Sequence, residues 1–287
     1  MKTSITEGQK KQYLRFVEDA AERALKEMAL DKDELQKLIE NGDEFQARII
    51  SAVRDLSVSN QYADEEVKSN YGYLSGYKPK GITEQINILR QLFPGVGNAL
   101  EKLVEGQLPP NAEGWFAIPR WEKIAPTYYE AVQKVIDLIK QTRNGAFYNY
   151  RDGQLGPQYL RQSQKASKAF QKLGDEQKDH DILVVPAQFG LRHRGRSVRR
   201  AREVMNASEF GLGAFAIGIM ILTHPERLQH YDDLWIDCAG DEFSPGAGGQ
   251  FDGAPVFHFG DGGVRFDADG IVGVSGFFGS ASAFLSQ

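Results

Sequence analysis

Six arginines and one histidine lie within eleven consecutive residues, 192–202. The chain has 17 arginines, so more than a third of them fall in this short stretch. The planar guanidinium group can hold a phosphate or a carboxylate with two parallel hydrogen bonds, and such a cluster is therefore typical of anion-binding sites. We take the following residues as candidate anion ligands: Arg192, His193, Arg194, Arg196, Arg199 and Arg200.

The elements expected around this cluster favour a phosphate ligand. Residues 182–186 (ILVVP) are typical of a buried strand. Residues 197–205 have a helical pattern that places apolar side chains on one face and arginines outward on the other. The loop between them follows a strand and precedes a helix N-terminus, where α/β proteins commonly bind anions. We therefore predict that the protein binds a phosphate-bearing ligand, foremost nucleic acid, with His193 as an auxiliary donor.

The charge distribution supports two alternatives for the same arginines. Residues 183–202 carry six basic and no acidic side chains, whereas residues 203–287 carry two basic and 12 acidic ones. The acidic segment could fold back and pair with the arginines in an internal ion-pair network. The arginine face could also bind an acidic partner protein, and the chain would then serve in interaction or assembly.

Three carboxylates near residues 234–238 (LWIDC) support a further hypothesis, a metal-dependent enzyme. Asp237, Asp241 and Glu242 surround the end of this predicted strand. If the strand lies parallel to residues 182–186, both carboxyl ends share one sheet edge and the carboxylates approach the arginines. They would then bind a divalent cation and act on a phosphorylated substrate, with His193 as acid or base. No other cofactor is predicted, and the alternative role of these carboxylates is to neutralise the arginines.

Two other motifs allow more than one interpretation. The segment GWFAIPRW, residues 114–121, combines two tryptophans with Arg120. Aromatic rings beside an arginine can stack on nucleobases, and they can also fill an apolar seam between domains. The segment GLGAFA, residues 211–216, fits the spacing of a dinucleotide-binding loop, but we expect it to form a closely packed helix that begins at Ser208.

Composition and charge argue against several classes of protein. Hydrophobic residues make up 41% of the chain and charged residues 25%, as in ordinary globular proteins. The longest uncharged apolar stretch, residues 210–222, is shorter than the about 20 residues that a membrane span needs. The single cysteine, Cys238, excludes an intrachain disulfide and is expected to be buried. We expect a soluble cytoplasmic protein without a membrane partner.

Residues 1–106 are expected to form a helical domain. Apolar residues recur at three- and four-residue spacing from Tyr13 to Met28, and a second helix is expected to begin at an Asp31 cap and to end at Gly42. A third helix is expected over residues 43–56, and residues 57–81 are expected to form a tyrosine-rich loop. The paired prolines of QLPPNAEG, residues 107–114, mark the predicted domain boundary.

Residues 107–287 are expected to form a second domain. Predicted strands at 115–119, 146–150, 182–186 and 234–238 alternate with helices. From residue 240 onward, 12 of 48 residues are glycine, and turns separate the short apolar runs PVFHF, VRF and IVGV. The predicted fold class is α/β (mixed α+β), in which the helical domain precedes an α/β domain that ends in an antiparallel β-meander. The sequence predicts neither the identity of the ligand nor the oligomeric state.

Overall fold

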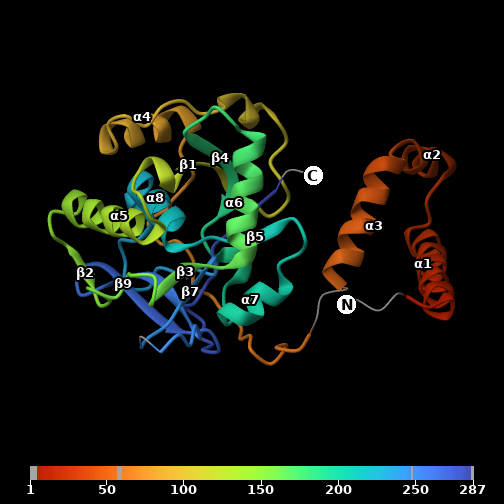
Figure 1. The fold of residues 1–287 in the computed structure, drawn as a ribbon. Coiled ribbons are helices and arrows are strands. Elements are labelled where there is room, and N and C mark those ends of the chain that lie inside the picture. The colour runs from red at the N-terminus through yellow and green to blue at the C-terminus, as the bar shows by residue number, and fades with distance from the viewer. Residues whose placement is uncertain (1–4, 57–59, 247, 286–287) are drawn as a thin grey trace. The chain divides into compact units, whose positions relative to one another are not determined.

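The computed structural model describes residues 5–56, 60–246 and 248–285 (Figure 1). The chain divides into two compact units, Met1–Ser57 and Val58–Gln287. The mixed α/β class predicted from the sequence is confirmed, because helices and antiparallel and mixed sheets are both present. Among the helices of the described residues, none is long and apolar enough to cross a membrane.

The described residues of the first unit form helices only. These are α1 (Glu7–Met28), α2 (Lys32–Glu40) and α3 (Gly42–Leu56). Thr6 and Asp31 begin α1 and α2 with capping boxes, in which the cap side chain and the side chain three residues later satisfy each other's backbone amides. The predicted Asp31 cap is therefore confirmed, whereas Gly42 begins α3 after a C-cap at Asn41.

The boundary between the units differs from the predicted one at residues 106–107. Helix α4 (Ile82–Leu92) packs against strand β1 (Gly114–Pro119) within the second unit. Its fully buried Gln85 donates a hydrogen bond to the Trp115 carbonyl at 2.9 Å and accepts one from the Ala117 amide at 3.0 Å. The stretch from residue 82 to the predicted boundary, which also holds the 3-10 helix η1 (Glu101–Glu105), therefore belongs with the sheet that follows it.

One layer of the second unit is an antiparallel four-stranded sheet. Its strands lie in the order β1, β4 (Ile182–Gln188), β10 (Ser282–Phe284) and β5 (Glu209–Gly211). Every residue of β4 is buried, as its apolar sequence predicts. Helix α8 (Ala214–Thr223), which is buried along its whole length, packs against β1 and against α5 (Tyr128–Thr142) (Figure 1).

A second sheet contains the C-terminal hairpin. The order of its strands is β2 (Phe147–Asn149), β9 (Gly263–Gly270), β8 (Gly253–Gly260), β7 (Asp241–Phe243) and β3 (Leu160–Gln162), and β6 (Ile236–Asp237) pairs with β8. The tight β8–β9 turn contains Asp261 and Gly262, both with positive φ. The runs PVFHF and VRF therefore form antiparallel strands as expected, but residues 271–274 (IVGV) are not a strand.

Two expectations about the order of elements are wrong. The strands at residues 182–186 and 234–238 are not parallel neighbours, because β4 and β6 belong to different sheets. Residues 209–211 form β5 instead of helix, and α8 begins only after Gly213. Gly211 is still a site of close packing, since a Cβ atom there would lie 2.5 Å from the Ala239 carbonyl carbon.

Candidate functional site

The arginine cluster is paired with carboxylates of the same chain. Glu209 of β5 has a fully buried side chain that accepts hydrogen bonds from Nε of Arg192 at 3.0 Å, from Nε2 of His193 at 2.7 Å and from the Ser282 hydroxyl at 2.6 Å. Burial favours the neutral acid, but the hydrogen bond and charge of the neighbouring groups lower the pKa of Glu209 to about 2. Glu209 is therefore ionised inside the fold.

His193, which lies in the 3-10 helix η3 (Leu191–His193), links this helix to β5. Its side chain is fully buried, and burial lowers its pKa, so the ring is neutral near pH 7. Nη1 of Arg196 lies 3.3 Å from Nδ1, and this contact requires a lone pair on Nδ1. Nε2 then carries the ring hydrogen and donates a hydrogen bond to Glu209, so both ring nitrogens of His193 form hydrogen bonds within the protein.

Glu65 and Glu66, in the loop that follows the first unit, pair with the arginines of helix α7 (Val198–Val204) and its approach. Glu65 accepts from Nε of Arg199 at 2.7 Å, and Glu66 accepts from Nε of Arg196 at 2.7 Å. The hydrogen bond from Arg199 lowers the pKa of Glu65. Sequence reasoning missed these two carboxylates because they lie more than 120 residues before the cluster in a segment without periodicity.

The remaining arginines bind mainly within the fold. Arg200, which was expected to face outward, is buried at 6% exposure and pairs with Glu203 at 2.8 Å. Arg202 donates to the Ala239 carbonyl at 2.9 Å. Arg194 is exposed and donates to the Tyr71 carbonyl at 3.0 Å. These contacts favour the internal-pairing alternative, although Glu65 and Glu66 come from outside the acidic segment. Phosphate binding by the cluster stays a prediction.

The three carboxylates of the metal-enzyme hypothesis lie in three different settings. Asp241 accepts hydrogen bonds from the Tyr128 hydroxyl at 2.8 and 2.9 Å and from the Ala214 amide at 2.7 Å. Glu242 pairs with Arg161 at 2.7 Å. Asp237 is buried, and its Oδ2 has no hydrogen-bond partner among the described residues. Nor do the described residues contain a group of three side chains that could hold a metal ion.

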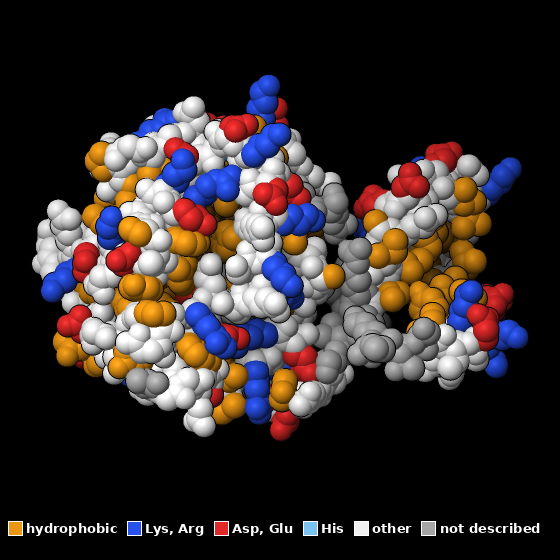
Figure 2. Space-filling view, in the orientation of Figure 1, with side chains coloured by type: hydrophobic (Ala, Val, Ile, Leu, Met, Phe, Trp, Pro, Cys, Tyr) orange, Lys and Arg blue, Asp and Glu red, His pale blue; other side chains and the backbone are white. Residues whose placement is uncertain are grey.

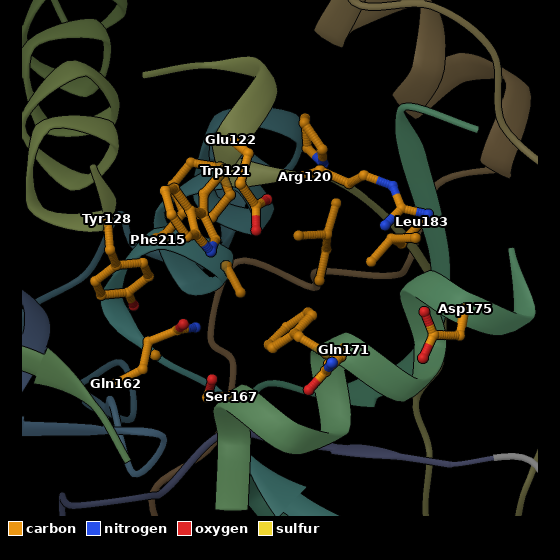
Figure 3. Close-up of a pocket in the computed structure, with 15 residues that line it drawn as sticks. Arg120, Trp121, Glu122, Tyr128, Gln162, Ser167, Gln171, Asp175, Leu183 and Phe215 are labelled. Carbon is orange, nitrogen blue, oxygen red and sulfur yellow. The ribbon is translucent and has the colours of Figure 1, made fainter. Parts of the chain in front are cut away.

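A pocket of about 340 Å³ lies between helix α6 (Gln164–Glu176) and the residues Arg120 and Trp121. These two residues belong to the segment GWFAIPRW, residues 114–121. It is of the size that holds a small ligand. Apolar residues of β1, β4 and α8 form part of its wall. The polar lining consists of Arg120, Glu122, Tyr128, Gln162, Ser167, Gln171 and Asp175. Figure 3 shows the Glu122 carboxylate pointing into the cavity, with Gln162, Ser167 and Gln171 on the opposite side.

Most of the polar side chains in this pocket have no partner in the part of the chain that the structure describes. Among the described residues, no hydrogen bond or ion pair is made by the side chains of Glu122, Gln162, Ser167, Gln171 and Asp175. The pocket therefore contrasts with the arginine cluster, whose charged groups are bound by the chain itself. Glu122, Ser167, Gln171 and Asp175 are exposed to solvent and Gln162 is partly buried, so these groups are accessible to a ligand that enters the pocket.

Arg120 is an ordered part of the pocket wall. Its guanidinium group donates to the carbonyl oxygens of Gly174 at 2.7 Å, Gln177 at 3.0 Å and His180 at 2.8 Å. These bonds hold the end of α6 next to the strand β1 and use much of the donor capacity of the arginine. The tryptophan and arginine segment lies within the second unit and does not fill a seam between the two units, whereas base stacking by its tryptophans stays a prediction.

Tyr128 connects the pocket to a titratable group behind it. Burial raises the pKa of Asp241 to about 7, although the hydrogen bonds from Ala214 and Tyr128 oppose the increase. Burial likewise raises the pKa of Tyr128, so its hydroxyl keeps its proton and directs it to the carboxylate. The phenol oxygen can accept a hydrogen bond from a ligand, and the Tyr128–Asp241 pair can take up a proton near neutral pH.

No family model, curated protein or solved structure matches this chain.

Proposed function

We propose that the second unit binds a small, neutral or cationic ligand that is rich in hydrogen-bond donors. The observation that carries the proposal is the convergence of five polar side chains, four of them solvent-exposed, on one pocket of about 340 Å³. None of the five has a hydrogen-bond or ion-pair partner among the residues that the structure describes. These side chains offer carboxylate, amide and hydroxyl oxygens, which accept hydrogen bonds. A ligand with several hydroxyl or amino groups complements such a lining.

The charges of the pocket support the same class of ligand. Glu122 and Asp175 are acidic, and the guanidinium group of Arg120 is already bound to three carbonyl oxygens. Arg120 keeps its positive charge, but the two carboxylates outnumber it, so the charged lining sums to -1 and attracts an ammonium group more than a phosphate. The pocket therefore favours an amine or a polyol over a phosphorylated molecule.

Trp121 and the volume of the pocket narrow the class of ligand further. Trp121 belongs to the 3-10 helix η2 (Trp121–Lys123), and its ring makes an edge contact with Tyr128, with the ring centroids 6.1 Å apart. An aromatic face can pack on the apolar side of a saturated ring, and it also attracts a cation. An amino sugar of single-ring size combines a ring, hydroxyl groups and an ammonium group, and it is the ligand class that we infer.

Isothermal titration of the full chain with four probes tests the proposal. The probes are glucosamine, glucose, inorganic phosphate and a mixed-sequence oligonucleotide, each small probe at up to about 10 mM so that a Kd near 1 mM is detectable. We expect saturable binding of glucosamine, weaker binding of glucose and no binding of phosphate. If neither sugar binds, or if phosphate binds more tightly than glucosamine, the proposal is wrong.

The oligonucleotide tests the second candidate function, nucleic-acid binding by the arginine cluster. Arg194 favours this function because it is exposed and its side chain, within the described part of the chain, binds a backbone carbonyl and no carboxylate. The ion pairs of Arg192, Arg196 and Arg199 weigh against it, because a phosphate must compete with carboxylates already in place. Binding that weakens steeply with salt and is reduced in Arg194→Ala would support this second function.

The other two hypotheses for the cluster have weaker support. A metal-dependent enzyme would need Asp237, Asp241 and Glu242 to act together, and they face different partners. An acidic partner protein would have to replace the carboxylates that bind the arginines now. Both remain predictions that the contacts do not favour.

A further inference from the structure

The first unit exposes the apolar faces of all its helices. None of the residues whose exposure is described between 5 and 56 is buried. Large hydrophobic side chains are more than a third exposed on each helix, including Phe16 and Met28 of α1, Ile39 of α2 and Ile50 of α3. Figure 2 shows hydrophobic side chains gathered over these helices, with charged side chains toward the outer edges. A folded monomer seldom leaves so continuous an apolar surface uncovered.

Helices as short as α2 and α3 are not expected to be stable while their apolar faces are exposed to water. Helix α2 has nine residues and α3 has 15, and isolated helices of such lengths are marginally stable in water. Most helical stability in proteins comes from burial of an amphipathic face. The three helices therefore need an apolar partner surface to become stable.

Helix α1 carries the widest of these apolar faces. At 100° per residue, its apolar side chains cover about half of the helix circumference. This stripe consists of Tyr13, Leu14, Phe16, Val17, Ala20, Ala21, Ala24, Leu25 and Met28. Within it, the positions 14, 17, 21, 24 and 28 alternate in steps of three and four, the spacing that packs one helix against another in a left-handed pair. The stripe is thus suited to bind a second helix of similar length.

The charges of α1 are arranged to complement a reversed copy of the same helix. Residues 7–17 contain three basic side chains and one acidic side chain, a net charge of +2. Residues 18–28 contain two basic and four acidic side chains, a net charge of -2. An antiparallel pair of α1 helices places each positive half beside the negative half of its partner, whereas a parallel pair would place like charges together.

We propose that this chain forms a homodimer in which α1 packs antiparallel against α1 of a second copy. The 22 residues of α1 span about 33 Å, which allows several helical turns of apolar contact. Such a contact has two-fold symmetry, so the attraction between a positive half of one α1 and the negative half of the other occurs twice in the dimer. The dimer covers the apolar face that α1 exposes, and it is independent of what the second unit binds.

Sedimentation velocity of the full chain over a range of concentrations tests this proposal. The wild type is expected to change from monomer to dimer as its concentration rises. The double variant Leu14→Gln and Leu25→Gln keeps the charges of α1 and is expected to weaken the dimer about a hundredfold or more, because leucine side chains from both copies lose their burial. A wild type that stays monomeric at every concentration overturns the proposal.

Charge reversal tests whether the two α1 helices pack antiparallel. Lys10→Glu with Lys11→Glu gives both halves of α1 a net charge of -2 and is expected to weaken the dimer about tenfold. Adding Glu18→Lys and Glu22→Lys restores opposite halves with reversed sign, and dimerisation should return. The first change places acidic residues near the helix N-terminus, which favours the helix itself. A loss of dimer that the four-residue variant does not recover contradicts the antiparallel arrangement.

Discussion

Replacing Glu209 with Gln tests whether the arginine cluster is a structural network. The substitution keeps the size of the side chain but removes the negative charge that binds Arg192, His193 and Ser282. The new amide group would also direct donor hydrogens at groups that are themselves donors. We expect Glu209→Gln to fold with reduced stability, because breaking a buried ion pair leaves an uncompensated charge.

The magnitude follows from the pKa of Glu209. Its decrease from 4.5 to about 2 on folding corresponds to about 3 kcal/mol of stability at pH 7. No correction for solvent screening is needed, since the side chain is 0% exposed. Because the folded pKa lies below the unfolded one, this stabilisation is present above pH 4.5 and is lost as the pH falls toward 2. At about pH 3, roughly 1.4 kcal/mol remains.

Urea denaturation followed by circular dichroism measures the effect at about pH 7 and about pH 3. Glu66→Gln is the matched control, because Glu66 also pairs with arginines of the cluster but its side chain is 37% exposed. We expect the control to cost less than about 1 kcal/mol. If both variants lose the same stability, or if the loss in Glu209→Gln is equal at the two pH values, the interpretation of Glu209 as a buried ionised group is wrong.

Two further predictions concern the buried carboxyl groups of Asp237 and Asp241. Burial, followed by repulsion from Asp269, raises the pKa of Asp237 to about 8, so the wild type loses stability as the pH rises from about 4 to about 8. Asp237→Asn removes this cost and should be more stable to urea than the wild type at about pH 9, by at most about 6 kcal/mol, with a small difference at about pH 4. Equal stability of the two proteins at high pH would contradict this prediction. Tyr128→Phe removes one donor from Asp241 and should cost about 1–3 kcal/mol at neutral pH. NMR titration of the Asp241 carboxyl should then give a pKa above about 7, and an unchanged value would show that this hydrogen bond does not favour the ionised form.

Elements with strong local signals could be predicted from the sequence. The apolar run of β4 can only be buried on both faces, and the Asp31 cap satisfies backbone amides within its own turn. Helix α5 has Thr127 as its N-cap, whose hydroxyl accepts a hydrogen bond from the Glu130 amide, as the spacing of these two residues indicates. In each case the residues that determine the element are neighbours in the sequence.

Pairings between distant residues could not be predicted in the same way. Glu65 and Glu66 bind arginines more than 120 residues away, and nothing in their local sequence distinguishes them from other solvated carboxylates. The short β6 pairs with β8 through main-chain hydrogen bonds that any sequence can make, so its apolar residues indicated a strand but not its neighbours. The expected parallel pairing with β4 was wrong for this reason.

The pocket could not be predicted from the sequence either, although Arg120 and Trp121 form part of the GWFAIPRW motif. Its lining comes from the strands β1, β3 and β4, from η2 and from the helices α5, α6 and α8, together with residues between these elements. Single polar residues such as Glu122 and Gln171 have no spacing that marks them as ligands. Their significance is visible only when the fold brings them together without partners.

The most direct test of the central claim is the affinity of glucosamine for Glu122→Gln, measured by isothermal titration beside the wild type. Glu84→Gln is the matched control, because Glu84 is an exposed carboxylate on α4 outside the pocket. Loss of a charged hydrogen-bond acceptor should weaken binding about tenfold or more in Glu122→Gln. Wild-type affinity is expected in Glu84→Gln. Glucosamine binding that is unchanged in Glu122→Gln, or that is absent from the wild type, would contradict the assignment of this pocket as the ligand site.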